Sequence, residues 1–426
     1  MGPIKLYFDI RDIFRAPRLA LSGKKIMIML KGILIGYAAY WIFTTISFIL
    51  CGYTLGNMWA DYGLYPCLFT VGVTGGYIPW YACAVYDIGV FLLIVSISLS
   101  CTQVSRVTYK QLKGDEFFSS TDACSYVKKH WQAVIMAPVS IALIITFFLF
   151  FSGIFALFGK IPYVGEFLFS IPYLFYFLGA LFTIYTGIVF LISLIYSPAI
   201  VGVGEEDTMG TVFQSYSITW SQPWRVILYH ISLLPVLVIG VHVFKWFMTT
   251  SFSLINAVFG CDWFMGDKLN RIVSNAYENI YPEFINQICL SFNAICTTAC
   301  NSCCSCLSFI PFNNGSDLSG TEVISSIILS CFLFIIVLAV VSYGLSILSV
   351  SETLMYIIFK KKSDDDNLLD HKDEDELEDE DETGFDTNDG SDNDDQTGTI
   401  DEKDSTVNAS NDDNKKSDST KEVPSE

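Results

Sequence analysis

Charged residues are scarce over most of this chain, which limits what the protein can be. Only 16% of the 426 residues are charged, whereas 52% are hydrophobic, a balance that soluble domains rarely tolerate. Residues 167–204 contain no Asp, Glu, Lys, Arg or His. As one helix this run would be roughly 57 Å long, longer than a bilayer core of about 30 Å. We therefore predict a membrane protein, with helix breaks at Pro172 and Pro198.

Motifs for nucleotide binding or hydrolytic chemistry are missing as well. The sequence has no Walker A loop, no His-Glu-x-x-His, no Gly-x-Ser-x-Gly and no dinucleotide fingerprint. There are only four histidines, and His230 and His242 would be turned about 120° apart on a helix, which argues against one shared site. We therefore predict no catalytic residue, no cofactor, no metal site and no nucleic-acid partner.

The apolar runs predict an all-α fold with six transmembrane helices in three hairpins. A cleavable signal peptide is not expected, since about thirty charged and mixed residues precede the first run. Residues 363–426 hold 26 of the 44 acidic residues and almost no apolar ones, so this acidic tail is expected to be disordered. The predicted spans are 32–51, 88–104, 133–155, 172–196, 225–244 and 323–350.

These spans divide the chain into seven parts. They are a basic amphipathic segment (1–31), transmembrane hairpin 1 with a Gly- and aromatic-rich outer loop (32–104), an amphipathic helix (105–131), transmembrane hairpin 2 (132–203), a second amphipathic helix (204–225), transmembrane hairpin 3 with a Cys-rich outer loop at 245–321 (226–362) and the acidic tail (363–426).

The distribution of Lys and Arg predicts the orientation. If the N-terminus is cytoplasmic, sixteen Lys and Arg residues of the first 362 lie inside and four lie outside, as the positive-inside rule requires. Both termini, the acidic tail and the amphipathic helices would then face the cytoplasm. The loop 245–321 would face the exterior or a lumen.

Three segments before the hairpins are predicted to lie at the membrane interface. In 4–25 apolar and basic residues occupy neighbouring arcs of a helix, interrupted by Pro17 into two pieces, which suits an anionic leaflet. Residues 115–131 form a predicted short helix with Asp122 near its N-terminus. The predicted headgroup contacts are Arg11, Arg15, Arg18, Lys24 and Lys25, and the apolar face of the third segment is Met209, Val212, Phe213, Tyr216 and Trp220.

Seven of the 13 cysteines lie in the last outer loop. In an oxidising compartment they favour disulfides. Because seven is odd, one thiol would stay free or pair elsewhere, and free or acylated thiols or a zinc site are the alternatives. A zinc site is less favoured because the loop has no His. These cysteines are Cys261, Cys289, Cys296, Cys300, Cys303, Cys304 and Cys306.

Short motifs suggest modification and sorting. Asn314 begins an Asn-Gly-Ser glycosylation sequon in the same loop. Leu368 and Leu369 follow three Asp residues, like an acidic dileucine sorting signal, and Tyr109-Lys-Gln-Leu112 resembles the tyrosine-based type. The acidic tail would capture a basic protein partner or bind cations weakly.

The sequence therefore predicts a non-enzymatic membrane scaffold or accessory protein that contacts lipid headgroups and protein partners. The alternative is a transporter or channel for a small or lipid-like solute, lined by the Gly- and Tyr-rich spans one, two and four. Intramembrane ionisable residues, which usually mark an ion or substrate path, are few, and this favours the scaffold.

Overall fold

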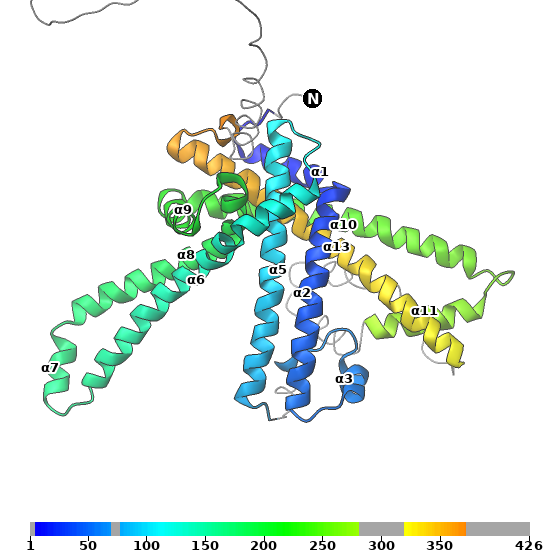
Figure 1. Cartoon of the computed structure of the whole chain (residues 1–426), viewed down its shortest axis with the longest axis horizontal. Helices are drawn as coiled ribbons and strands as arrows, with labels where there is room; N and C mark the ends of the chain where they lie inside the picture. The colour runs from blue at the N-terminus through cyan, green and yellow to red at the C-terminus, as the bar shows by residue number, and fades with distance from the viewer. Residues whose placement is uncertain (1–4, 70–76, 281–318, 372–426) are drawn as a thin grey trace, which may run out of the picture. The chain divides into compact units, whose positions relative to one another are not determined.

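The structure is a computed structural model that describes residues 5–69, 77–280 and 319–371 (Figure 1). Within these ranges every regular element is a helix, which confirms the all-α class for this part of the chain. The tail predicted to be disordered from residue 363 is ordered as far as His371, because a helix runs to Asp364 and a 3-10 turn covers Leu368–Asp370. The tail beyond residue 371 lies outside the described residues, so its disorder stays a prediction.

In the part of the chain that the structure describes, six helices are long and apolar enough to cross a membrane, which indicates a multi-pass membrane protein and agrees with the predicted number. These six helices are α2 (Gly23–Leu50), α5 (Trp80–Lys113), α6 (Ser120–Phe158), α8 (Tyr173–Gly204), α10 (Pro223–Phe259) and α13 (Gly320–Asp364). The shorter elements are η1 (Ile10–Arg15), α1 (Ala16–Ala20), α3 (Leu55–Tyr62), α7 (Val164–Ser170), α9 (Thr208–Ser221), α11 (Asp267–Ile280) and η3 (Leu368–Asp370).

The long helices extend beyond the apolar runs that predicted them, and residues 120–131 are not a separate helix. The Ser119 hydroxyl oxygen accepts hydrogen bonds from the backbone amides of Thr121 and Asp122, at 3.2 and 3.1 Å. From this cap α6 runs without a break through the third apolar run. Hydropathy predicts only the part of a helix that can lie in the hydrocarbon core. The helix itself extends further, to where its backbone hydrogen bonds end.

The predicted break at Pro198 is wrong. Pro172 is the N-cap of α8, but Pro198 lies inside the helix, which ends at Gly204. Pro198 is buried, and packing by neighbouring helices compensates for the one backbone hydrogen bond that proline removes. Helices α6 and α10 likewise continue past Pro138 and Pro235.

Part of the predicted outer loop 245–321 is helical. Helix α10 continues to Phe259, and α11 packs against the start of α13. Arg271 of α11 forms an ion pair with Glu322 at 2.9 Å. The Ser326 hydroxyl of α13 donates a hydrogen bond to Asn275 Oδ1 of α11 at 2.7 Å. This segment is therefore attached to a spanning helix along its length.

Helices α2 and α5 lie side by side in Figure 1 and approach closely at small residues. The Ser96 hydroxyl of α5 donates to the Gly32 carbonyl of α2 at 2.7 Å. A Cβ atom placed on Gly36 would lie 2.9 Å from Ser96 Cβ, and one on Gly89 would lie 2.9 Å from Phe43 Cβ. The absence of side chains at these glycines is what lets the two backbones meet.

One end of each long helix joins a common core, which we call the helix-end junction. It contains the N-terminal parts of α2, α6 and α10, the C-terminal parts of α5 and α8, α13 from Phe334 to Phe359, and α1. Figure 1 shows α13 crossing this region next to α5 and α8. Its buried members include Met29, Leu112, Ala123, Ala199, Tyr229, Leu354 and Ile357.

We expect Gly36→Val to destabilise the protein by about 1–3 kcal/mol, because the added side chain overpacks the α2–α5 contact. Gly153→Val is the matched control, since a Cβ on Gly153 in α6 meets no atom within 4 Å. Thermal unfolding in detergent measures both variants. Equal losses of stability would contradict the close packing at Gly36.

Candidate functional site

An ion pair lies at the centre of the helix-end junction. The Arg106 guanidinium of α5 is 2.7 Å from Glu205 Oε1, directly after α8. The Arg106 side chain has no exposed surface and Glu205 is 15% exposed. A charge removed from water in this way is costly unless an opposite charge accompanies it, so Glu205 determines where the end of α5 meets the end of α8.

Helix α6 joins the same group through Tyr126. Its hydroxyl donates to the Val201 carbonyl of α8 at 2.6 Å. Its ring faces the Arg106 guanidinium, with 4.2 Å between the Arg106 Cζ and the ring centroid, a distance at which cation and ring attract each other. Three helices therefore share one guanidinium.

Close backbone contact between α5 and α8 makes this arrangement geometrically achievable. A Cβ on Gly202 would lie 2.8 Å from Ser105 Cβ and 3.0 Å from the Thr102 carbonyl oxygen. Gly202 thus brings Glu205, one turn later, within reach of Arg106.

Helix α13 is held to the junction by hydroxyl and amide groups. The Ser349 hydroxyl donates to the Cys101 carbonyl of α5 at 2.9 Å and lies 3.3 Å from the Ser105 hydroxyl. Gln222, between α9 and α10, donates to the Phe359 carbonyl at 3.1 Å. These groups satisfy one another in a buried setting, as polar groups in a helix interface must.

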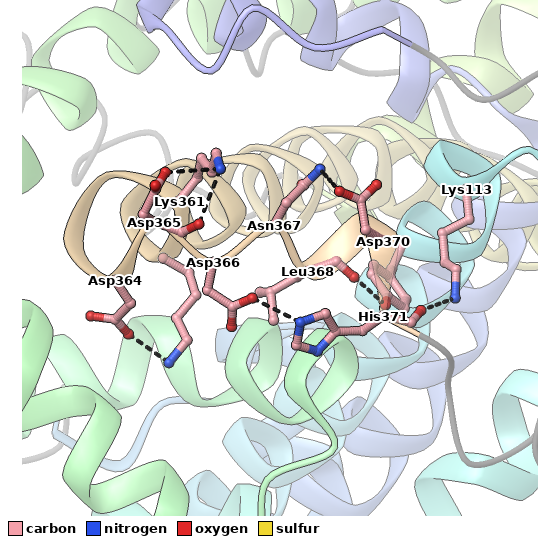
Figure 2. A network of polar contacts seen from close by, with 11 residues as sticks. Lys113, Lys361, Asp364, Asp365, Asp366, Asn367, Leu368, Asp370 and His371 are labelled. Carbon is pink, nitrogen blue, oxygen red and sulfur yellow. Dashed lines mark hydrogen bonds and ion pairs between the residues drawn. The ribbon is translucent and has the colours of Figure 1, made fainter. Parts of the chain in front are cut away.

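The chain folds back onto α5 at the end of α13 (Figure 2), and we call the segment from the last residue of α13 onward, Asp364–His371, the C-terminal seat. The Tyr109 hydroxyl donates to the Leu368 carbonyl at 2.8 Å, and Lys113 Nζ donates to the His371 carbonyl at 2.7 Å. Within the seat His371 Nε2 is 2.8 Å from Asp366 Oδ1. Two residues of α5 thereby hold the seat by its backbone.

Both predicted sorting motifs lie in this contact. Leu368 is 7% exposed and Tyr109 1%, and Leu112 is fully buried. A receptor binds a linear signal as an accessible peptide, so neither motif is available in this conformation. The sorting role of Leu368 and Leu369 stays a prediction, and an unchanged cellular location of a Leu368→Ala, Leu369→Ala variant would remove it.

The predicted headgroup residues fall into two groups. Arg11 and Arg18 are exposed, while Arg15 donates to the Lys5 carbonyl at 2.9 Å. Lys24 donates to the Phe118 carbonyl.

Lys25 differs from the prediction. It is fully buried, and its Nζ donates to the Leu19 carbonyl and Gln111 Oε1, at 3.0 and 2.9 Å. These protein oxygens replace water around the ammonium, so Lys25 does not reach headgroups in this structure.

The N-terminal segment is attached to α13. The Tyr343 hydroxyl donates to the Pro17 carbonyl at 3.2 Å, and Lys362 Nζ forms an ion pair with Asp9 at 2.9 Å. The hydrogen bond and charge of Lys362 lower the pKa of Asp9. The pair is therefore intact at neutral pH and is lost only as the pH falls through this lowered pKa.

Most of the predicted outer-loop sites lie outside the described residues. These are Cys289, Cys296, Cys300, Cys303, Cys304, Cys306 and Asn314. Cys261 is exposed just after α10, and its pairing stays a prediction. Among the residues that the structure describes, no group of three or more His, Cys, Asp or Glu side chains is placed to hold a metal ion.

The Arg106–Glu205 pair does not follow from the sequence, because no local pattern links two residues so far apart in the chain. The one available signal is that each is the first charge after a long uncharged run, which places it where a helix leaves the hydrocarbon.

No protein-family model, no curated protein sequence and no solved structure matches this chain. Functional assignment therefore depends on its own residues.

We expect Glu205→Gln to lower the stability by about 3 kcal/mol, the lower limit for breaking a buried pair, because it leaves a guanidinium without its counter-charge. Glu206→Gln is the control, since Glu206 contacts Gln214 at 3.3 Å outside the pair. Thermal unfolding in detergent compares them. Adding Arg106→Met to Glu205→Gln should recover part of the loss, and no recovery would contradict the pairing.

We expect Tyr109→Phe to loosen the C-terminal seat, because the Leu368 carbonyl loses its hydroxyl donor. Hydrogen exchange should speed up in peptides covering 366–371. Tyr163→Phe is the control, because Tyr163 is 83% exposed. Unchanged exchange in the Tyr109 variant would mean that the hydroxyl does not hold the seat.

Proposed function

We propose that this protein is a non-enzymatic membrane scaffold that binds anionic lipid headgroups and a basic protein partner at the helix-end junction. The supporting observation is that the ends of all six long helices meet in one buried core that also holds the Arg106–Glu205 pair. A core of this kind fixes the surfaces around it relative to one another. It suits a protein that presents surfaces rather than one that opens a polar path.

The proposed orientation puts the junction and both termini in the cytoplasm, with the six helices as three hairpins. Sixteen of the twenty Lys and Arg residues in 1–362 lie on this side, in accord with the positive-inside rule. Lys113 and Lys362, which contact the seat and the N-terminal segment, belong to this basic side.

Lipid contact would come from the basic segment and from α9. Arg11 and Arg18 project from η1 and α1 without burial. On α9 the side chains of Met209, Phe213 and Trp220 are 61%, 68% and 80% exposed, while Thr211, Ser215 and Thr219 face the protein. Exposed apolar side chains on α9 and exposed arginines on the N-terminal segment each suit the boundary between headgroups and acyl chains.

The acidic tail would supply the partner contact. The tail (363–426) begins with the C-terminal seat, and its 26 acidic residues outnumber five Lys. Such a charge attracts a basic protein surface, or cations weakly.

The transporter alternative has one observation in its favour, a large apolar cavity between α6 and α8. It favours a lipid-like solute over a polar one. Against a route between spans one and two, α2 and α5 are in close contact at Gly32, Gly36 and Gly89.

Proteoliposomes containing the full chain or a variant ending at His371 distinguish these functions. We expect the full chain to bind a synthetic Lys-rich peptide and the truncated variant to lose most of this binding. The affinity should fall as salt approaches 0.15 M, where the Debye length is about 8 Å. Neither form should move a fluorescent phospholipid or a small solute faster than protein-free vesicles. Flux that survives truncation would favour the transporter instead.

The same preparation tests the lipid contact. Arg18→Gln should weaken retention of phosphatidylserine over phosphatidylcholine by about 1 kcal/mol, the usual value for one basic residue at an anionic surface. Lys268→Gln is the control, since Lys268 is exposed in α11 on the predicted outer side. Equal effects of the two variants would contradict a headgroup site in the N-terminal segment.

A further inference from the structure

Between α6, α7 and α8 lies a cavity of about 750 Å³, within the range of small-molecule sites. Its walls are mainly aromatic and aliphatic, with Phe147, Phe151 and Phe155 from α6 and Phe175 and Gly179 from α8. In Figure 1 α6 and α8 lie side by side, with α7 at their far end from the junction. The cavity therefore lies along two spanning helices and away from the Arg106–Glu205 pair.

The lining offers little to a polar ligand. Among the residues that the structure describes, no Asp, Glu, Lys, Arg or His lines the cavity. The Tyr176 hydroxyl donates to the Leu168 carbonyl at 3.3 Å, and the Thr183 hydroxyl donates to the Gly179 carbonyl at 2.8 Å. These two hydroxyls are already used inside the protein. Ser152 adds one more hydroxyl to the lining, and the other lining residues are apolar or glycine, so the cavity recognises mainly hydrocarbon.

The length of the cavity matches one leaflet of a bilayer. Along α8 its lining runs from Pro172 to Ile184, which corresponds to about 18 Å of helix. One leaflet contributes about half of the roughly 30 Å hydrocarbon core. An acyl chain entering from the α7 end would thus extend through its own leaflet.

Two charged residues lie at the α7 end of the cavity. Lys160 and Glu166, in the turn before α7 and in α7, are the only Asp, Glu, Lys or Arg residues between Lys129 and Glu205. An ammonium and a carboxylate in this one short segment complement a zwitterionic headgroup, whose phosphate is negative and whose amine is positive.

We propose that this cavity binds one acyl chain of a zwitterionic phospholipid, with the headgroup at the turn that carries Lys160 and Glu166. The site goes beyond the scaffold function, because it lies at the other end of these helices from the junction. Failure of either proposal leaves the other standing.

The test uses the full-length protein in vesicles of phosphatidylcholine with a photoreactive diazirine in one acyl chain. After illumination, mass spectrometry locates the labelled residues. We expect labels to concentrate on the cavity-lining parts of α6 and α8 in the wild type. Labels spread evenly over all lipid-facing helices would overturn the proposal, as would cross-links to a second copy of the chain at this site.

Gly179→Phe is the variant that fills the cavity. A Cβ on Gly179 meets no atom within 4 Å, and the same holds for Gly187, which lies two turns later and outside the lining. Gly179→Phe should reduce cavity labelling several-fold while Gly187→Phe leaves it unchanged. Equal labelling of the two variants would overturn the proposal.

A second variant covers the case in which Gly179→Phe does not fold. Ser152→Phe fills the cavity from α6, since Ser152 is a lining residue with an exposed side chain. It should cause the same several-fold loss. Lys160→Gln, which leaves the cavity itself intact, should reduce labelling by phosphatidylcholine less than either Phe variant does. A larger loss with Lys160→Gln would assign recognition to the headgroup rather than to the chain.

Discussion

The buried charge of Arg106 is the constraint on which the arrangement of helix ends depends. Because the Arg106 guanidinium has no exposed surface, water cannot solvate it, and Glu205 and the ring of Tyr126 interact with it instead. This requirement draws the ends of α5, α6 and α8 together. It also explains why the glycine at 202 stands where any side chain would separate α5 from α8. The hydroxyl contacts of α13 with α5 join a fourth helix to the helices that meet at the Arg106–Glu205 pair.

The membrane-spanning helices were predictable because hydrocarbon imposes a length and a composition on any segment that crosses it. Six such segments are predicted from the sequence, and the described residues contain six helices of that length and composition. The ends of the helices were not predictable in the same way. Pro198 marks a break by local rules, but the cost of proline is set by the neighbours that surround it. Residues 120–131 look like a separate helix in the sequence because their charged residues interrupt the apolar pattern. The backbone hydrogen bonds of α6 nevertheless continue through them.

The candidate site was much less accessible from sequence than the fold. Arg106 and Glu205 are far apart in the chain, and no local pattern links them. Lys25 is a second example. A lysine near an apolar run normally faces headgroups, but the Lys25 ammonium is buried and donates to two protein oxygens. The Leu368–Leu369 pair looks like an accessible peptide in the sequence, but in the structure the Tyr109 hydroxyl donates a hydrogen bond to the Leu368 carbonyl. Each of these cases depends on which residues distant in the chain come into contact, and the sequence alone does not show those contacts.

The backbone at Glu205 shows what the Arg106 charge demands of the chain. Glu205 has φ +54°, in the left-handed region, where helices commonly end on Gly or Asn. A longer side chain in this conformation costs about 1–2 kcal/mol. Glycine would relieve that strain and asparagine would tolerate it, but neither supplies a negative charge. Residue 205 therefore has a strained backbone conformation but supplies the carboxylate that Arg106 needs. Replacing Glu205 by a residue that relieves the strain but lacks the charge should therefore be less tolerated than keeping the charge.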